Sequence, residues 1–251
     1  MTENLIALVT GANQGIGLQI GTDLAANGVT VLLASRNLER GAAAAQTISG
    51  DAHPIQLDVT DPASIQAAVA QAEQQFGRLD ILINNAAISR ANGLESETMA
   101  DYIKRSRATV ISVNEVRTIW ETNVFGVLSV TQAFLPLLRK SPAARIVNVS
   151  SSLGSLTLNA APSPYRGTFN PGYGASKSAL NAITLAFAID LEEEGIKVNA
   201  VTPGFTSTAL NNYEGNETVE QGAAEAVRVA LLGSEGPTAT FTGSVNQTIP
   251  W

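Results

Sequence analysis

The chain has 251 residues, 45% of them hydrophobic, which is enough for one large α/β domain with a substantial core. Its formal net charge of −7 disfavours a surface that binds nucleic acid or an anionic membrane. No cysteine is present, so disulfides, thiolate metal sites and cysteine nucleophiles are excluded. The single histidine, His53, fits a loop better than a catalytic or metal-binding position, so acid–base chemistry would use tyrosine, lysine or a carboxylate.

Short apolar runs alternate with helical patterns along most of the chain. The apolar runs predict strands at residues 5–9, 29–34, 54–57, 79–83, 144–149, 197–201 and 241–245. The helical patterns predict helices at residues 15–27, 38–49, 62–76, about 95–107, 114–138, 173–194 and 219–232, with a loop at 150–172. Such alternation predicts one α/β domain, residues 1–251, with a doubly wound sheet of about seven parallel strands and helices on both faces.

The N-terminus enters the first strand without the basic and then apolar residues of a signal peptide. No window contains the ~18 apolar residues that a membrane span needs. The sequence therefore predicts a soluble, cytoplasmic protein that does not bind a membrane.

The turn between the first strand and the first helix reads Thr10-Gly-Ala-Asn-Gln-Gly-Ile-Gly17. Glycines let the backbone approach a diphosphate, and the helix N-terminus offers N–H groups and a positive dipole end. The spacing is not Gly-x-Gly-x-x-Gly, and taken alone it also fits a tight strand–helix turn. Its place in the first βα turn of a doubly wound sheet favours phosphate binding. The residues expected to bind the phosphates are Gly11, Asn13, Gln14, Gly15, Ile16 and Gly17.

The end of the second strand indicates which nicotinamide cofactor is favoured. A carboxylate there would bind the ribose hydroxyls and repel a 2′-phosphate. This chain instead has Ser35 and Arg36, with Arg40 one turn further on. A hydroxyl and a guanidinium suit a phosphate, and this interpretation is favoured over the alternative of a surface arginine in the first turn of a helix.

Polar residues follow the next two strands as well. Asp58 could accept a hydrogen bond from an adenine amino group or cap the following helix. Asn84 and Asn85 could bridge neighbouring strands and line a cleft, or simply mark a turn. Asn123 stands inside an apolar helix, where its amide either faces solvent or has a buried partner.

Tyr173 and Lys177 open a long amphipathic helix, four positions apart and therefore on one face. A free tyrosine has a pKa of about 10, and a neighbouring ammonium lowers it by stabilising the phenolate. The pair could therefore be a tuned proton donor. Taken alone, it fits an exposed helix start with a solvated lysine better.

The chain resembles the short-chain dehydrogenases/reductases over essentially its whole length, and this implies a Rossmann-type fold. The resemblance rests on motifs that occur in the family's order. They are Thr10-Gly11…Gly15-x-Gly17, Asp58-Val59, Asn84-Asn85-Ala86, Asn123, Asn148-Val-Ser-Ser-Ser-Leu-Gly154, Tyr173-x-x-x-Lys177 and Pro203-Gly204.

The resemblance implies a catalytic group made of Asn123, Ser151, Tyr173 and Lys177. Tyr173 would be the acid in ketone reduction and the base in alcohol oxidation, and Lys177 would lower its pKa and hold the nicotinamide ribose. Asn123 would hold a water linked to Lys177. Ser151 would polarise the substrate carbonyl, because the family serine stands three residues before the glycine, here Gly154.

The resemblance also implies NADP(H) as cofactor, since the pattern after the second strand is that of NADP(H)-preferring members. Beyond the glycine-rich turn, the residues expected to contact the cofactor are Ser35, Arg36, Asp58, Val59, Asn84, Ala86, Tyr173, Lys177, Pro203, Gly204, Thr206 and Thr208.

Two features depart from the family pattern. Ala87 stands where glycine is usual; its methyl group is expected to be tolerated, with crowding of the nearby cofactor as the alternative. Insertions at about 91–113 and 155–172 flank the expected carbonyl site, and residues 205–218 would form the substrate loop. These features are most similar to the carbonyl-reductase branch. The insertions also lie near surfaces that the family uses for assembly, which leaves a monomer, dimer or tetramer open.

The sequence therefore predicts NADPH-dependent reduction of a small, uncharged ketone or aldehyde, with the proton coming from Tyr173. Two alternatives stay open at this point. One is oxidation of an alcohol with NAD, and the other is a nucleotide-sensing protein without turnover. The presence of Ser151, Tyr173 and Lys177 argues against a sensor, which needs no proton donor.

Overall fold

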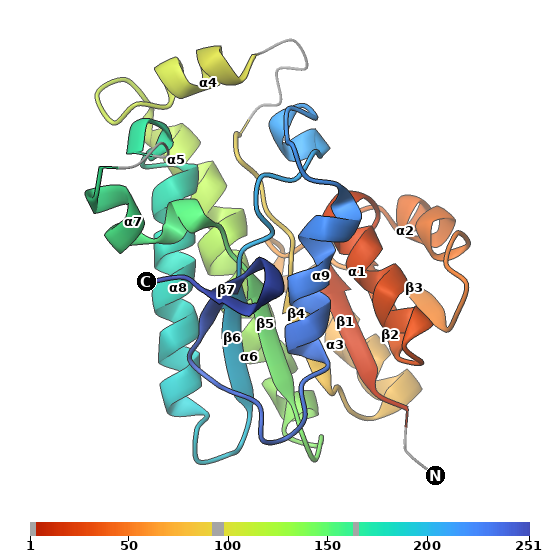
Figure 1. Ribbon diagram of the computed structural model, residues 1–251. Coiled ribbons are helices and arrows are strands. Elements are labelled where there is room, and N and C mark those ends of the chain that lie inside the picture. Colours follow the sequence, from red (N-terminus) through yellow and green to blue (C-terminus); the bar gives the residue numbers. More distant parts are fainter. Residues whose placement is uncertain (1–3, 92–97, 163–165) are drawn as a thin grey trace.

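The computed structural model describes residues 4–91, 98–162 and 166–251, which form one sheet with helices on both faces (Figure 1). The strand order is β3-β2-β1-β4-β5-β6-β7-β8, and all neighbours are parallel except the last pair. The predicted α/β, Rossmann-type doubly wound sheet is confirmed, with a short antiparallel strand added at one edge. The strands are β1 Ile6–Thr10, β2 Thr30–Ser35, β3 Ala52–Gln56, β4 Ile81–Asn84, β5 Arg145–Val149, β6 Lys197–Val201, β7 Phe241–Gly243 and β8 Gln247–Thr248.

Two apolar layers hold the helices to the two faces of the sheet. One face packs against α1 (Gly15–Ala26), α9 (Val219–Ala230) and the end of α2 (Leu38–Ala45). The other packs against α3 (Pro62–Phe76), α6 (Val127–Leu138) and α8 (Tyr173–Asp190). Because the central strands are buried on both faces, they are continuously apolar rather than alternating.

The helix α3 shows how local sequence sets an element's ends. The Asp61 side chain accepts a hydrogen bond from the Ala63 amide at 3.0 Å, and Pro62 occupies the first turn, where its missing N–H costs nothing. Gly77 ends the helix in the left-handed conformation, at φ 76°. The predicted bounds of this helix are confirmed at both ends.

Several other predicted bounds were wrong by a few residues. The predicted helix 38–49 ends at Ala45, and the predicted helix 173–194 ends at Asp190. In both cases tighter three-residue turns follow, such as Ile48 N–H to Ala45 O at 3.2 Å. The strand expected at 54–57 is β3, which begins at Ala52. The strand expected at 241–245 is β7, which ends at Gly243.

The predicted helix 114–138 consists of three joined segments. These are α5 (Val113–Trp120), a π-helical segment (Glu121–Gly126) and α6. Gly126 lies against the chain after β3, because a Cβ there would be 2.9 Å from the Val59 side chain. The π segment contains Asn123, and such segments occur mostly at functional sites.

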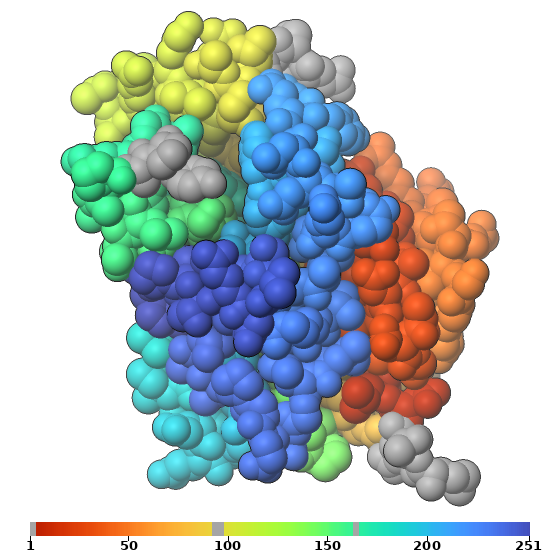
Figure 2. Space-filling model, in the orientation of Figure 1, coloured from red at the N-terminus to blue at the C-terminus, as the bar shows by residue number. Residues whose placement is uncertain are grey.

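Above the carboxyl ends of the strands lie the short helices α4 (Met99–Arg105) and α7 (Leu156–Ala160) and the segment 205–218 (Figure 1). In Figure 2 the α4 and α7 segments lie on one side of this end and the blue segment 205–218 on the other. Residues 92–97 of the first insertion, and so the start of the helix expected at 95–107, are outside the described residues. The predicted loop 150–172 also contains the 3₁₀ turns η2 (Ser152–Gly154) and η3 (Arg166–Thr168).

None of the helices in the described ranges has the length and apolar character that a membrane span requires.

Candidate functional site

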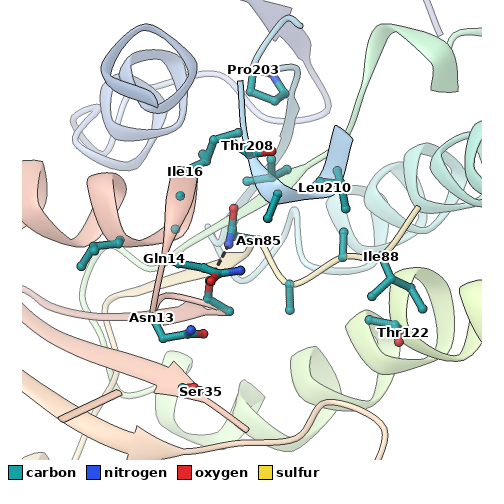
Figure 3. Close-up of a pocket in the computed structure, with 18 of the residues that line it drawn as sticks. Asn13, Gln14, Ile16, Ser35, Asn85, Ile88, Thr122, Pro203, Thr208 and Leu210 are labelled. Carbon is teal, nitrogen blue, oxygen red and sulfur yellow. Dashed lines mark hydrogen bonds between the residues drawn. The ribbon is translucent and has the colours of Figure 1, made fainter. Parts of the chain in front are cut away.

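A cleft of about 650 Å³ lies at the carboxyl edge of the sheet, where β1, β2, β4 and β5 end. Its size is that of ordinary ligand sites. The glycine-rich turn, the end of β2 and the first turn of α8 all contribute to its wall. Figure 3 shows Asn13, Gln14 and Ile16 on one side of it and Thr208 and Leu210 on another, with Asn85 between them.

The glycine-rich turn is shaped to bring its backbone close to a ligand. Gly11 and Gly15 have φ values of 64° and 57°, which favour glycine. A Cβ on Gly17 would collide with the Asn85 side chain and lie 2.5 Å from the Gly11 carbonyl oxygen. No described side chain caps the first turn of α1, so its N–H groups remain available to an anion.

The end of β2 places two guanidinium groups at one end of the cleft. Ser35 is buried, whereas Arg36 and Arg40 are exposed, and all three line the cleft. Asn37 caps α2 by accepting a hydrogen bond from the Arg40 amide at 2.9 Å. This bond fixes the backbone position from which the Arg40 side chain extends. Within the part of the chain that the structure describes, no ion pair engages either guanidinium, so both charges are available to an anionic group.

Asp58 and Val59 line the cleft next to this end, as expected. The Asp58 carboxylate also accepts from the Thr60 amide at 2.9 Å and hydroxyl at 2.7 Å. It therefore closes its own turn, and Asp61 caps α3.

The two asparagines after β4 have separate tasks. Asn84 is buried and donates to Asn148 Oδ1 at 2.8 Å and Thr131 Oγ1 at 3.1 Å, so it joins β4 to β5 and α6. Asn85 lines the cleft and donates to the Thr10 carbonyl at 2.9 Å. Asn84, which was expected to contact the cofactor, does not line the cleft, because its side-chain amide is bonded inside the protein.

Asn123 is fully buried, and its side-chain amide is hydrogen bonded within the protein. Its Oδ1 accepts from the Ile88 amide at 2.9 Å, and its Nδ2 donates to the Ile88 carbonyl at 2.8 Å and to Ser176 Oγ at 3.0 Å. Any water held here would have to use the backbone of the π segment. Thr122, the preceding residue, lines the cleft.

The three consecutive serines after β5 are separated by their hydrogen bonds. The Ser150 hydroxyl is buried and donates to Asn181 Oδ1 at 2.6 Å. The Ser152 amide donates to Thr202 Oγ1 at 3.1 Å. Ser151 is half-buried, its Oγ accepts from the Leu153 amide at 3.2 Å, and its hydroxyl lowers the pKa of Tyr173. The structure thus places Ser151, of the three, beside the tyrosine.

Lys177 lies one helical turn after Tyr173 and is 2% exposed. Its Nζ donates to the Val149 carbonyl at 2.8 Å and is 5.7 Å from the centre of the Tyr173 ring. Burial lowers the pKa of Lys177 from 10.5 to about 7, because a buried ammonium loses its hydration.

The pKa of Tyr173 moves opposite to the expectation. Burial is the largest cause and raises this pKa from 10.0 to about 12. A hydrogen bond from Ser151 lowers the pKa, and the nearby Tyr102 raises it further. The prediction that Lys177 leaves Tyr173 with a lowered pKa was wrong for this structure. Loss of solvent is the largest cause of the shift, and Lys177 is not among the groups that change this pKa.

Apart from Asn84, two other predicted cofactor contacts do not line the cleft. Thr206 is buried, donates to the Pro203 carbonyl at 2.8 Å and forms a bridge with Glu217. Gly204, at φ 74°, lies against the Glu217 carboxylate. Both residues therefore shape the loop, while Ala86, Pro203 and Thr208 line the cleft as expected.

Other residues line the cleft without having been predicted as contacts. Leu18 and Gln19 extend the glycine-rich turn, and Ser207, Leu210 and Tyr213 extend the contribution of the segment 205–218. Their types carry no recognisable signal, but their closeness in sequence to predicted contacts could have indicated them. Ala87 and Ile88 follow the Asn84–Ala86 motif in the same way.

The cleft fits a dinucleotide. It combines glycines whose Cβ atoms would fill the cradle, exposed N–H groups, a pair of guanidiniums at one end and a tyrosine–lysine pair at the other. Among the described residues there is no group of acidic, histidine or cysteine side chains suited to a metal ion.

Comparison with known proteins gives a consistent result. A family model described as short chain dehydrogenase matches residues 5–219. A short-chain dehydrogenase, anuI, of Penicillium roqueforti is 38% identical, covering 91% of this chain and 89% of its own. The (+)-neomenthol dehydrogenase of Arabidopsis thaliana is 34% identical, with coverages of 90% and 91%. The solved structure of salutaridine reductase from Papaver somniferum superposes with a TM-score of 0.80 at 30% identity, covering 95% of this chain and 99% of that one.

Proposed function

Because the chain belongs to the short-chain dehydrogenase family and is therefore an oxidoreductase, we propose that it reduces an uncharged ketone or aldehyde with NADPH. The observation that carries this proposal is the position of Tyr173. Its side chain lines the same cleft as the glycine-rich turn, and the Ser151 hydroxyl is close enough to lower its pKa. The proposed proton donor and the proposed dinucleotide site thus line the same cleft.

The residues divide the reaction into a proton step and a binding step. Tyr173 gives its hydroxyl proton to the carbonyl oxygen as that oxygen gains negative charge, and Ser151 holds the same oxygen by hydrogen bonding. Lys177 lines the same cleft and supplies a positive charge there when it is protonated. When bound, the dihydronicotinamide supplies the hydride to the carbonyl carbon.

The charges at the other end of the cleft support NADPH over NADH. Arg36 and Arg40 both reach the cleft next to the buried Ser35. Guanidiniums pair well with phosphate, whereas a ribose hydroxyl pair favours a carboxylate. Residues 35–40 include one carboxylate, Glu39, which does not line the cleft.

The wall near Tyr173 supports an uncharged substrate. The charged residues that line the cleft are Arg36, Arg40, Asp58 and Lys177, and the first three belong to the end away from Tyr173. The wall also includes the apolar side chains of Ile88 and Leu210. An anionic substrate would lose hydration there with Lys177 as its only charged neighbour in the described wall, which costs more than binding a neutral ketone.

The names of the relatives agree with carbonyl–alcohol chemistry. They include a reductase that acts on salutaridine and a dehydrogenase that acts on (+)-neomenthol. Both names support exchange between a carbonyl and an alcohol as the reaction of this chain, and the direction proposed here is reduction.

Replacing Tyr173 tests the proposal directly. We expect Tyr173→Phe to keep its affinity for NADPH, because the ring is retained, and to lose at least about 10²-fold in kcat, the usual contribution of a general acid. NADPH absorbance with a panel of ketones and aldehydes measures the rate, and quenching of protein fluorescence measures binding. Reductase activity retained in this variant would refute the role.

The same panel separates the rival functions. Faster turnover of an alcohol with NAD than of any ketone with NADPH would favour alcohol oxidation. Nucleotide binding without turnover of any compound in either direction would favour a sensor.

A further inference from the structure

One serine hydroxyl joins the segment 205–218 to the chain that follows β4. Ser89 Oγ donates a hydrogen bond to the Leu210 carbonyl at 2.8 Å. Ser89 itself does not line the cleft, whereas its neighbour Ile88 and its partner Leu210 both do. Figure 3 shows Ile88 and Leu210 on the same side of the cleft. The bond therefore links two stretches of chain that each contribute an apolar side chain to the wall.

The stretch that carries Ser89 is held in place by buried side chains. The Asn123 amide is bonded to both backbone groups of Ile88, at 2.9 Å to the N–H and 2.8 Å to the carbonyl. Tyr102 of α4 is 6% exposed and donates its hydroxyl proton to the Ser89 carbonyl at 2.7 Å. Because both Ile88 and Ser89 are bonded through their backbones, the Ser89 hydroxyl extends from a fixed position.

The same network reaches the backbone of Tyr173. Asn123 Nδ2 also donates to Ser176 Oγ at 3.0 Å, and the Ser176 hydroxyl donates to the Tyr173 carbonyl at 2.7 Å. Asn123 and Ser176 are both fully buried, so water does not compete for these bonds. Ile88 and Ser89 therefore have a fixed position relative to the proposed proton donor.

The segment 205–218, by contrast, is bonded to itself. Thr206 and Glu217 form a bridge near its two ends. The Asn211 side chain donates to the Thr206 carbonyl at 2.9 Å, and Leu210 precedes Asn211 in a 3₁₀ turn. These internal bonds give the segment its shape, but they do not fix Leu210 to the rest of the wall.

Two hydrogen bonds join the tip of this segment to the other side of the site. One is the bond from Ser89 to Leu210, between two half-buried residues. The other runs from the Met99 amide to the carboxylate of Glu214, which is exposed, at 3.1 Å. Water competes for an exposed carboxylate, so the shorter and less exposed bond from Ser89 contributes more to the position of Leu210.

We propose that Ser89 is a positioning residue that determines substrate specificity: by holding Leu210 at a fixed distance from Ile88, its hydroxyl limits the bulk that a ketone or aldehyde can carry beside its carbonyl. The inference rests on the proposed reductase function and narrows its substrate class to compact carbonyl compounds.

The test begins with Ser89→Ala and two ring ketones, cyclohexanone and menthone, which carries an isopropyl group beside its carbonyl. We expect kcat/KM for menthone to rise about two- to tenfold relative to that for cyclohexanone, the scale of one hydrogen bond. The kcat for cyclohexanone should stay within about twofold, because other bonds hold Tyr173. An unchanged or lower ratio in this variant would overturn the inference.

The matched control is Ser106→Ala, which removes a buried serine hydroxyl of α4's last turn whose bond is local, to the Ile103 carbonyl at 3.3 Å. It should leave the ratio for the two ketones unchanged. Leu210→Ala, which widens the wall directly, should raise the ratio at least as much as Ser89→Ala does. If Leu210→Ala left the ratio unchanged, Leu210 would not limit the substrate and the inference would fail.

Limited proteolysis with chymotrypsin tests the attachment without any turnover. Tyr213 is 69% exposed and offers a cleavage site inside the segment. We expect cleavage there, relative to cleavage elsewhere in the chain, to become about two- to tenfold faster in Ser89→Ala and to stay unchanged in Ser106→Ala.

Unchanged cleavage in Ser89→Ala would overturn the inference even if the native chain reduced no carbonyl compound, a result that by itself counts only against the proposed function. Faster cleavage with an unchanged ketone ratio in an active enzyme would also overturn it.

Discussion

Burial controls the protonation of both titratable groups at the catalytic end of the cleft. With a pKa of about 12, Tyr173 keeps its proton throughout the neutral range. Lys177, with a pKa of about 7, changes charge within that range. A tyrosine that keeps its proton is ready to act as an acid, which suits reduction, whereas its use as a base in oxidation would require alkaline conditions or further stabilisation of the phenolate.

The proposed preference for NADPH depends on single residues after β2. We expect Arg36→Ala to weaken NADPH binding by about tenfold or more, the scale of a charge-assisted hydrogen bond, and to leave NADH binding nearly unchanged. Arg117→Ala, which removes an exposed arginine on α5, serves as the control and should change neither affinity. Fluorescence titrations with both nucleotides measure the effect. Equal losses for NADPH and NADH would identify Arg36 as a general surface charge.

For individual residues, the sequence was most informative about site residues that lie close together in the chain. The glycine-rich turn and the Tyr173–Lys177 pair are short stretches, and the structure brings their residues to one cleft. Thr206 was expected to contact the cofactor, but it does not line the cleft, because a bridge to Glu217, on a segment that runs back beside it, sets its position. The pKa of Tyr173 likewise depends on burial by distant segments, which no local pattern encodes.

Among the elements, the turn η2 and the helix α8 approach each other backbone to backbone. A Cβ on Gly154 would lie 2.8 Å from the carbonyl carbon of Lys177 and 3.0 Å from its Cβ. This contact fixes the position of η2, which follows Ser151, relative to α8. Separation of the two elements would therefore move Ser151 relative to Tyr173.

Gly154→Ala tests the importance of this contact. We expect it to destabilise the fold by about 1–3 kcal/mol, as overpacking does, and to lower kcat more than it raises KM. Gly167→Ala is a matched control in the segment that leads to α8, where no atom of the described residues lies within 4 Å of the added Cβ. Chemical denaturation and steady-state kinetics give the two readouts. Similar behaviour of the two variants would show that the approach at Gly154 is not important.

Element type was predictable from periodicity, but element geometry was not. The apolar pattern of residues 114–138 predicted a single helix, and it cannot distinguish the α-helical from the π-helical hydrogen bonds around Asn123. The helix α4 is polar and short, so its pattern left its bounds open. Its position is set instead by tertiary bonds, such as Met99 N–H to Glu214 Oε1 at 3.1 Å.

For the molecule as a whole, the buried lysine links stability to pH. The unfolded chain holds a proton on Lys177 up to about its ordinary pKa of 10.5, whereas the folded chain releases it near pH 7. The unfolded state therefore binds more protons between these values, and the free energy of unfolding rises with pH across that window. Below pH 7 both states hold the proton, so this contribution becomes constant.

A Lys177→Met variant should lack this slope. Relative to the variant, we expect the native chain to gain on the order of 1 kcal/mol or more of unfolding free energy between pH 7 and pH 9.5. Urea denaturation at several pH values measures the difference. Lys104→Met, which removes an exposed lysine on α4, should run parallel to the native chain. A Lys177→Met curve that also ran parallel would contradict the assigned direction of the pKa.

The ends of the strand order have a consequence for how the protein behaves at high concentration. An open sheet can pair with another chain along its outermost strands, β3 and β8. At one end β8 has only two residues. At the other, Leu57 donates its N–H to the Ser35 carbonyl, so by strand alternation the nitrogen of Pro54 faces away from β2 and has no hydrogen to offer a neighbour. Both borders of the sheet are thus poor templates for self-association into fibrous aggregates.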